Sequence, residues 1–190
     1  MAQDTPQDPQ QDRPVSLDEF EEQRRQYYGI PKGLSVALRT QESGGKQYDK
    51  NGGVLTSPKN AKGRYQVLPD TAARYGLNAD DPFENTEAAF RYMADLHKKV
   101  DPSVKDPGER WASVVAGYHS GEGGLNKINK TGKMPGTNDG LIKTDDYVSS
   151  IMKRWQQHDA GDTGTPTAQP ASQPEAAPLR PVRRDQVPGP

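Results

Sequence analysis

The chain has 190 residues and a formal net charge of −1, so its overall charge offers no attraction to nucleic acid or to an anionic membrane. It has no cysteine, which excludes disulfide bonds, thiolate catalysis and cysteine-based zinc sites. The three histidines, His97, His119 and His158, lack the spacing of metal ligands, and we expect neither a metal nor another cofactor.

Hydrophobic residues make up 31% of the chain and are concentrated in its middle. Residues 1–15 and 159–190 are rich in proline and polar residues and have no aromatic side chain, so we expect two disordered tails. Residues 16–158 would form one domain around one core. The N-terminus lacks the pattern of a secretory signal and no apolar run reaches transmembrane length, so we expect no membrane insertion.

Two helices are predicted in the first 45 residues. The first starts at Ser16, because Ser16 and Glu19 have the spacing of a capping box, and it ends at Gly29. The second starts at Pro31, since proline is favoured in the first turn of a helix, and it ends at Gly44.

The second predicted helix carries a carboxylate in an unusual place. Leu34, Leu38 and Glu42 follow one another at intervals of four residues, so they lie along one face of the helix. Glu42 is either a solvated residue of the last turn, as most helical glutamates are, or a general acid whose pKa is raised by burial. Periodicity alone favours the solvated residue.

The rest of the chain predicts a mainly α fold with one irregular or β excursion. Glycines and asparagines between residues 46 and 65 indicate turns, and residues 54–56 and 65–67 are candidate short strands that would pair. Further helices are predicted over residues 69–75, 85–100, 109–119, 125–130 and 145–157.

Four short motifs stand out in this framework. Each has an ordinary explanation on its own: Ser57–Pro58 fits a turn, and Tyr118 and Tyr147 lie on apolar stripes where aromatic residues normally fill the core. In chain order the motifs are Glu42-Ser43, the segment from Ser57 to Gln66, the segment from Ala116 to Gly121, and the segment from Thr144 to Val148.

Together, the four motifs resemble the lysozyme-like domain of the soluble lytic transglycosylases. The family pattern is Glu-Ser, then Ser-Pro-x-Gly-Ala-x-Gly-Leu-Met-Gln, then Ala-Tyr-Asn-x-Gly, then a late Tyr-Val. The resemblance covers residues 28–155 and implies a lysozyme-like α+β fold. The matching positions are Glu42, Ser43, Ser57, Pro58, Ala61, Gly63, Gln66, Tyr118, Gly121, Tyr147 and Val148.

The chain departs from the family pattern at several positions. His119 replaces the usual Asn, Gly117 the usual Ala, and Arg64-Tyr65 the usual Leu-Met. Asn60 stands where the family has Gly, an exchange that still tolerates a left-handed backbone. The loop from residue 43 to residue 56 is also longer than usual. These departures affect the expected substrate contacts and loop shape more than the role of Glu42.

The resemblance implies cleavage of the β-1,4 bond between N-acetylmuramic acid and N-acetylglucosamine in peptidoglycan. A protonated Glu42 would donate its proton to the glycosidic oxygen, and the substrate's acetamido group would stabilise the charge that develops. Glu42 would then accept the C6 hydroxyl proton as a 1,6-anhydro ring closes without water. A pKa of about 6, like that of the glutamate that serves lysozyme as its general acid, would suit this role.

The resemblance also implies roles for other residues. The Tyr118 hydroxyl would orient Glu42, Ser57 and Gln66 would hydrogen-bond the sugar, and Leu68 would provide apolar contact. Gly63 would shape the loop.

Two further residues have less specific roles. Tyr147 is either a residue of the cleft wall or a core aromatic. His119 is interpreted as a substrate-edge or structural residue, because nothing in the sequence places it against Glu42 as a base.

Two other activities remain open at this point. One is a hydrolytic muramidase of the goose type on the same fold, which needs a second carboxylate, and Asp49 in the long loop is the nearest candidate. The other is a non-catalytic peptidoglycan-binding module.

The biological setting is a separate prediction. Ser120-Gly121-Glu122-Gly123 resembles a variant in transglycosylase segments of virion proteins from short-tailed phages. We expect a virion-associated protein that opens the host wall during genome entry, with peptidoglycan strands and other virion or tail proteins as partners. A lysis enzyme, or an accessory of secretion through the cell envelope, is the alternative.

Overall fold

The computed structural model describes residues 15–133 and 143–161. The two predicted tails lie outside the described residues except at their inner ends. Residues 159–161, which were expected to belong to the C-terminal tail, instead continue the last helix.

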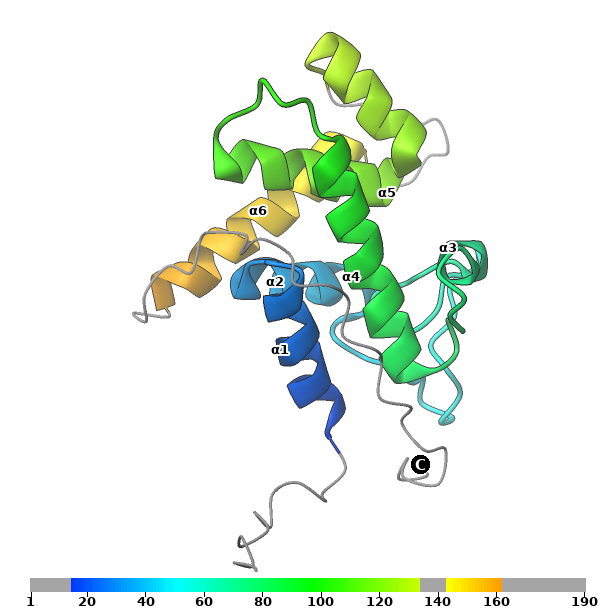
Figure 1. The fold of residues 1–190 in the computed structure, drawn as a ribbon. Coiled ribbons are helices and arrows are strands. Elements are labelled where there is room, and N and C mark those ends of the chain that lie inside the picture. The colour runs from blue at the N-terminus through cyan, green and yellow to red at the C-terminus, as the bar shows by residue number, and fades with distance from the viewer. Residues whose placement is uncertain (1–14, 134–142, 162–190) are drawn as a thin grey trace, which may run out of the picture.

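Six helices form this part of the chain (Figure 1). Helix α2 packs on α6, α4 on α5 and α5 on α6, while α1 lies against α4. Their bounds are α1 Leu17–Tyr27, α2 Lys32–Ser43, α3 Pro69–Ala73, α4 Pro82–Lys99, α5 Pro107–Thr131 and α6 Thr144–Gly161. The buried side chains form one core that includes Ile30, Leu34, Leu38, Phe90, Met93, Leu96, Val114 and Ile151. The prediction of a mainly α fold is confirmed.

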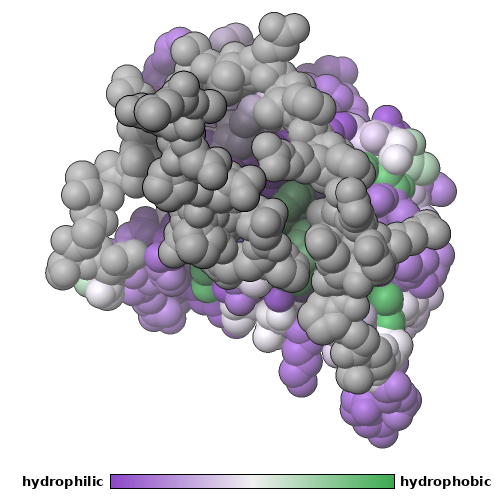
Figure 2. Space-filling model, turned by 60° about the horizontal axis from the view of Figure 1, so that its bottom comes forward, coloured by the Kyte–Doolittle hydropathy of each residue, from purple (hydrophilic) through white to green (hydrophobic). Residues whose placement is uncertain are grey.

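The described surface exposes few large hydrophobic residues. On the face that Figure 2 shows, the coloured surface is largely hydrophilic and the apolar residues form small, separate patches. Among the described residues, the exposed large hydrophobic side chains are Val15, Tyr48 and Leu68. Leu68 differs from the other two because it lines the groove described below.

The predicted helix ends are confirmed for α1 and α2. The Ser16 hydroxyl accepts from the Glu19 amide at 3.2 Å, and the Ser16 amide donates to the Glu19 carboxylate at 2.9 Å, which is a complete capping box. Helix α2 ends at Gly44, whose φ of 65° is the left-handed conformation that glycine adopts without strain.

Two other helices differ from their predicted extent. Helix α4 begins at Pro82 and not at Asn85, because the Asp81 side chain caps it by accepting from two backbone amides of the first turn. The predicted helices over residues 109–119 and 125–130 are the two halves of α5, which is interrupted at Gly121, where φ is 74° and ψ is 177°. The break in α5 was predicted. The start signal of α4, Asp81 followed by Pro82, was overlooked.

The predicted pairing of residues 54–56 with residues 65–67 is wrong. Instead, isolated bridges join Tyr48 to Val54, Thr56 to Lys62, and Lys62 to Val67. Positive φ angles at Gly63 (67°) and Gln66 (49°) turn the chain back on itself between residues 62 and 67, so Val67 pairs with Lys62 and not with residues 54–56.

The turn is anchored by Arg64 and Tyr65, two of the residues that depart from the family pattern. Arg64 donates to the carboxylates of Glu21 and Asp18 on α1, each at 2.9 Å. Tyr65 is fully buried and packs edge-on against Phe90 of α4, with ring centroids 5.2 Å apart. The exchange of Leu-Met for Arg-Tyr therefore ties the loop to α1 as well as to the core.

Gly63 and Asn60 have the backbone that this loop requires. Asn60 adopts a left-handed φ of 65°, as its place in the motif predicted. A Cβ at Gly63 would lie 2.8 Å from Gln47 Nε2 and 3.1 Å from Asn85 Cγ, so Gly63 is required for both its φ and its close contacts.

Gly63→Ala should lower the free energy of unfolding by about 1–2 kcal/mol through its φ angle, and by at least ~1 kcal/mol more through overpacking. Gly76→Ala is the matched control, because Gly76 has a φ of 69° and a Cβ there meets nothing within 4 Å. Urea unfolding of the two variants measures the difference. Equal losses at the two positions would contradict a packing role for Gly63.

Candidate active site

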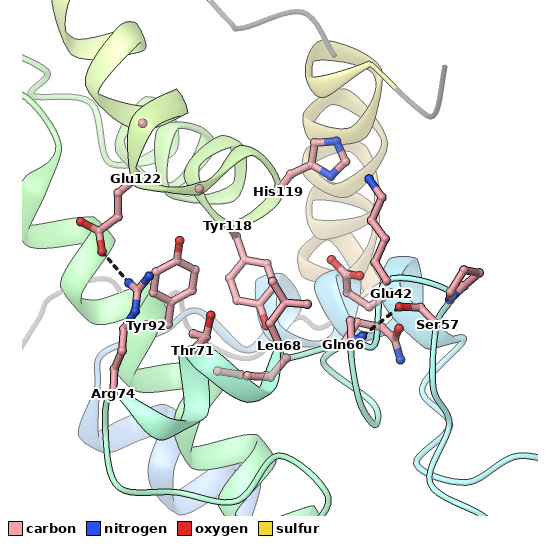
Figure 3. A pocket seen from close by; sticks show the side chains of 17 residues that line it. Glu42, Ser57, Gln66, Leu68, Thr71, Arg74, Tyr92, Tyr118, His119 and Glu122 are labelled. Atoms are coloured by element: carbon pink, nitrogen blue, oxygen red, sulfur yellow. Dashed lines mark hydrogen bonds and ion pairs between the residues drawn. The ribbon is translucent and has the colours of Figure 1, made fainter. Parts of the chain in front are cut away.

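A groove with a volume of about 1060 Å³ runs across the domain (Figure 3). One wall comes from the loop and α3, the other comes from α5, and α4 contributes Ala89 and Tyr92. This volume lies slightly above the range of about 300–1,000 Å³ for small-molecule sites, so the groove suits an extended ligand. It contains the predicted site residues Glu42, Ser57, Gln66, Leu68, Tyr118 and His119.

Glu42 lies in the last turn of α2 and reaches into this groove. Leu38 and Leu34, one and two turns earlier on the same face, are fully buried. Burial disfavours the charged carboxylate and raises the pKa of Glu42 to about 7. The raised pKa favours the general-acid interpretation of the Leu34–Leu38–Glu42 stripe over the solvated-residue interpretation, and the catalytic role of Glu42 stays a prediction.

The hydrogen-bond partner of Glu42 is Tyr147, which lies in the first turn of α6. The Tyr147 hydroxyl donates a hydrogen bond to Glu42 Oε1. This bond lowers the pKa of Glu42, but its effect is smaller than that of burial. The Tyr147 ring is buried and stacks on His119, with ring centroids 4.2 Å apart and planes 23° apart. The structure thus joins residues from α2, α5 and α6 at one point.

The predicted role of Tyr118 as the partner of Glu42 is wrong. The Tyr118 hydroxyl donates to the backbone carbonyl of Tyr65 at 2.8 Å, so it fixes the loop to α5. The Tyr118 ring still lines the groove beside Tyr92, with centroids 5.6 Å apart. The sequence motifs place both Tyr118 and Tyr147 near Glu42, but the direction of each hydroxyl depends on how α5 and α6 pack.

Ser57 and Gln66 use part of their hydrogen-bonding capacity to hold the loop. Ser57 Oγ accepts from the Ala61 amide at 3.0 Å, and Gln66 Nε2 donates to the Gly63 carbonyl at 2.8 Å. Each side chain retains a group for a ligand, the hydroxyl proton of Ser57 and the amide oxygen of Gln66. Leu68, 46% exposed, adds apolar surface to the groove.

Several groove residues were not predicted. They are Lys59, Thr71, Arg74, Tyr92 and Glu122. Lys59 and Glu122 lie within or beside the sequence motifs, so adjacency to those motifs was a usable signal. Tyr92, one residue before the buried Met93, gave no signal because a helix can place such a residue either in solvent or against a neighbouring element.

Asp49, the candidate second carboxylate, does not line the groove. Its Oδ1 accepts from the amides of Asn51 and Gly53 at 2.8 and 3.1 Å, so this carboxylate caps the turn of the long loop. Within residues 15–133 and 143–161, no group of three or more His, Asp or Glu side chains is arranged to hold a metal ion.

A small helical domain whose groove holds a protonatable glutamate at the end of a buried helix is of the lysozyme-like class. The sequence model of the family described as Transglycosylase SLT domain matches residues 19–139. The chain belongs to this family.

Curated relatives share part of the chain. The membrane-bound lytic murein transglycosylases D of Escherichia coli strain K12 and of E. coli O6:H1 strain CFT073 are each 39% identical to it over 88 residues. The match covers 43% of this chain and 18% of each relative. In the part of the chain that the structure describes, no helix has the length and apolarity of a membrane span.

Tyr147→Phe should raise the pKa of Glu42 above about 7, because the variant loses a hydrogen bond that favours the carboxylate. Tyr118→Phe should leave this pKa nearly unchanged and should instead cost about 1 kcal/mol of unfolding free energy, since the Tyr65 carbonyl loses its donor. A ¹³C NMR titration of the Glu42 carboxyl, with urea unfolding, measures both effects. A larger pKa change in Tyr118→Phe would refute the assignment of Tyr147.

Proposed function

We propose that this chain is a lytic transglycosylase that cleaves the β-1,4 bond between N-acetylmuramic acid and N-acetylglucosamine in peptidoglycan and leaves 1,6-anhydro ends. The observation that carries the proposal is the single protonatable carboxyl of Glu42, with a pKa of about 7, in a groove suited to an extended ligand. Membership of the SLT domain family and the partial match to the two murein transglycosylases support the same reaction.

In the first step Glu42 acts as the general acid. Near pH 7 about half of the Glu42 side chains hold a proton, and this proton passes to the glycosidic oxygen as the bond to muramic acid C1 breaks. The positive charge that develops at C1 is stabilised by the substrate's own acetamido oxygen, which substitutes for a second protein carboxylate.

In the second step Glu42 acts as the base. The Tyr147 hydroxyl bonds the carboxylate that proton transfer creates, and a charge-assisted hydrogen bond of this kind is stronger than the bond to the neutral acid. Glu42 takes the proton of the C6 hydroxyl, and the C6 oxygen attacks C1 to form the 1,6-anhydro ring. The proton that Glu42 lost is regained, and no water is consumed.

The positions of the other acidic residues favour this route over hydrolysis. A hydrolytic muramidase needs a second carboxylate to activate water or to form a covalent intermediate. Among the described residues that line the groove, the carboxylates are Glu42 and Glu122. Glu122 is ion-paired with Arg74 and Lys99 and lies at the other end of the groove (Figure 3), and Asp49 caps a turn.

Glu42→Gln should lower the rate of cleavage on the order of 10²–10⁴-fold while glycan binding persists, because it removes the transferable proton and keeps the shape of the side chain. Wild-type activity should fall as the pH rises through about 7, since the acid form is lost there. Turbidity of purified sacculi measures the rate, and mass spectrometry of the products measures the fraction of 1,6-anhydro ends.

Glu109→Gln is the matched control, because Glu109 is an exposed glutamate of α5 outside the groove. Products with reducing muramic acid ends would establish hydrolysis in place of transglycosylation. Wild-type protein that binds sacculi without releasing any products would establish a binding module.

We further propose that the protein is carried in a phage virion and acts on the host wall during genome entry. The likeness of Ser120-Gly121-Glu122-Gly123 to virion transglycosylase segments motivates this setting. Mass spectrometry of purified particles from the phage that encodes the chain should detect the protein. Its absence from particles, with accumulation before lysis, would identify a lysis enzyme instead.

A further inference from the structure

An ion-pair cluster lies at the end of the groove opposite Glu42 (Figure 3). Arg74 Nη1 is 3.0 Å from Glu122 Oε1, and Lys99 Nζ is 2.7 Å from Glu122 Oε2. These cations lower the pKa of Glu122, chiefly through the Lys99 hydrogen bond, so Glu122 is charged under the conditions in which Glu42 holds a proton. The proposed reaction does not use this cluster.

The Arg74–Glu122 pair connects the two walls of the groove. Arg74 is the C-terminal cap of α3 and rises from one wall, whereas Glu122 descends from α5 on the other wall. The non-helical residue Gly121 directly precedes Glu122 in α5. Tyr92 of α4 also lines this end of the groove and lies beside Arg74 (Figure 3).

We propose that the Arg74–Glu122 ion pair is an end wall of the groove that restricts how far a glycan strand extends past Glu42 on the α3 side. This inference rests on the proposed function. A glycan strand with few sugars beyond the scissile bond fits between Glu42 and the end wall. A cut in the middle of a strand requires the glycan to extend past the end wall. The end wall therefore makes the protein cut preferentially near strand ends.

The solvent exposure of the Arg74 and Glu122 side chains determines how strongly the ion pair can restrict a glycan strand. The side chains of Arg74 and Glu122 are 57% and 39% exposed, and exposed ion pairs are weak and screened by salt. The pair thus biases where a strand binds and does not forbid internal cuts. This bias should weaken with ionic strength, which a wall built from packed apolar side chains would not do.

The test compares where strands are cut. Peptide-free glycan strands are digested by wild type and variants to the same total of new 1,6-anhydro ends, and the products are sized by chromatography. Arg74→Gln and Glu122→Gln should each raise the ratio of internal to terminal cuts about two- to fivefold, the range expected for the loss of an exposed ion pair.

Lys98→Gln is the matched control, because it removes a comparably exposed ion pair, with Asp95 of α4, outside the groove and should leave the ratio unchanged. Raising the salt from about 0.05 to about 0.5 M should shift wild type toward the Glu122→Gln pattern and leave that variant unchanged. Thermal unfolding confirms that the variants are folded.

The two levels of the proposal fail in different ways. Cleavage by wild type with the same cut ratio in both single variants would overturn the end wall alone. The absence of any 1,6-anhydro product from wild type would overturn the proposed function, and the end wall with it.

Discussion

The desolvation of one carboxyl group is the constraint on which the functional site depends. Glu42 lies at the end of a helix whose inner face is buried through Leu34 and Leu38, and this burial raises its pKa to about 7. Because this pKa exceeds the ordinary value, the unfolded chain releases the Glu42 proton first as the pH rises. The folded state therefore loses stability between the ordinary pKa and about pH 7, which is the cost of keeping an acid protonated.

The contacts around Glu42 also connect three helices to one another. Tyr147 on α6 donates to Glu42 on α2, and His119 on α5 stacks on Tyr147. A change in the packing of α6 would therefore alter both the orientation of the acid and its pKa. The hydrogen bond to Tyr147 favours the carboxylate and burial favours the acid, so the pKa stays near neutrality, where one residue can donate a proton and later accept one.

The loop opposite the acid is held by a second set of contacts. Arg64 binds Glu21 on α1, Tyr65 fills the core beside Phe90, and Tyr118 bonds the Tyr65 carbonyl from α5. These contacts fix the backbone of the loop, and Ser57 and Gln66 line the groove from it. Helix α1 is itself fixed to α4 through the buried carboxylate of Glu87, which accepts hydrogen bonds from Arg24, Tyr28 and Arg91.

The sequence by itself determined the helical framework, the break at Gly121 and the position of Glu42, because capping, glycine conformation and helical periodicity are local properties. Only the tertiary structure decided that the Tyr147 hydroxyl, and not that of Tyr118, bonds the acid. Such a choice depends on how two distant helices pack, and no local pattern records it. The same reason explains the wrong strand pairing near Gly63, where the loop backbone bonds Gln47 and Asn85, two side chains distant in sequence.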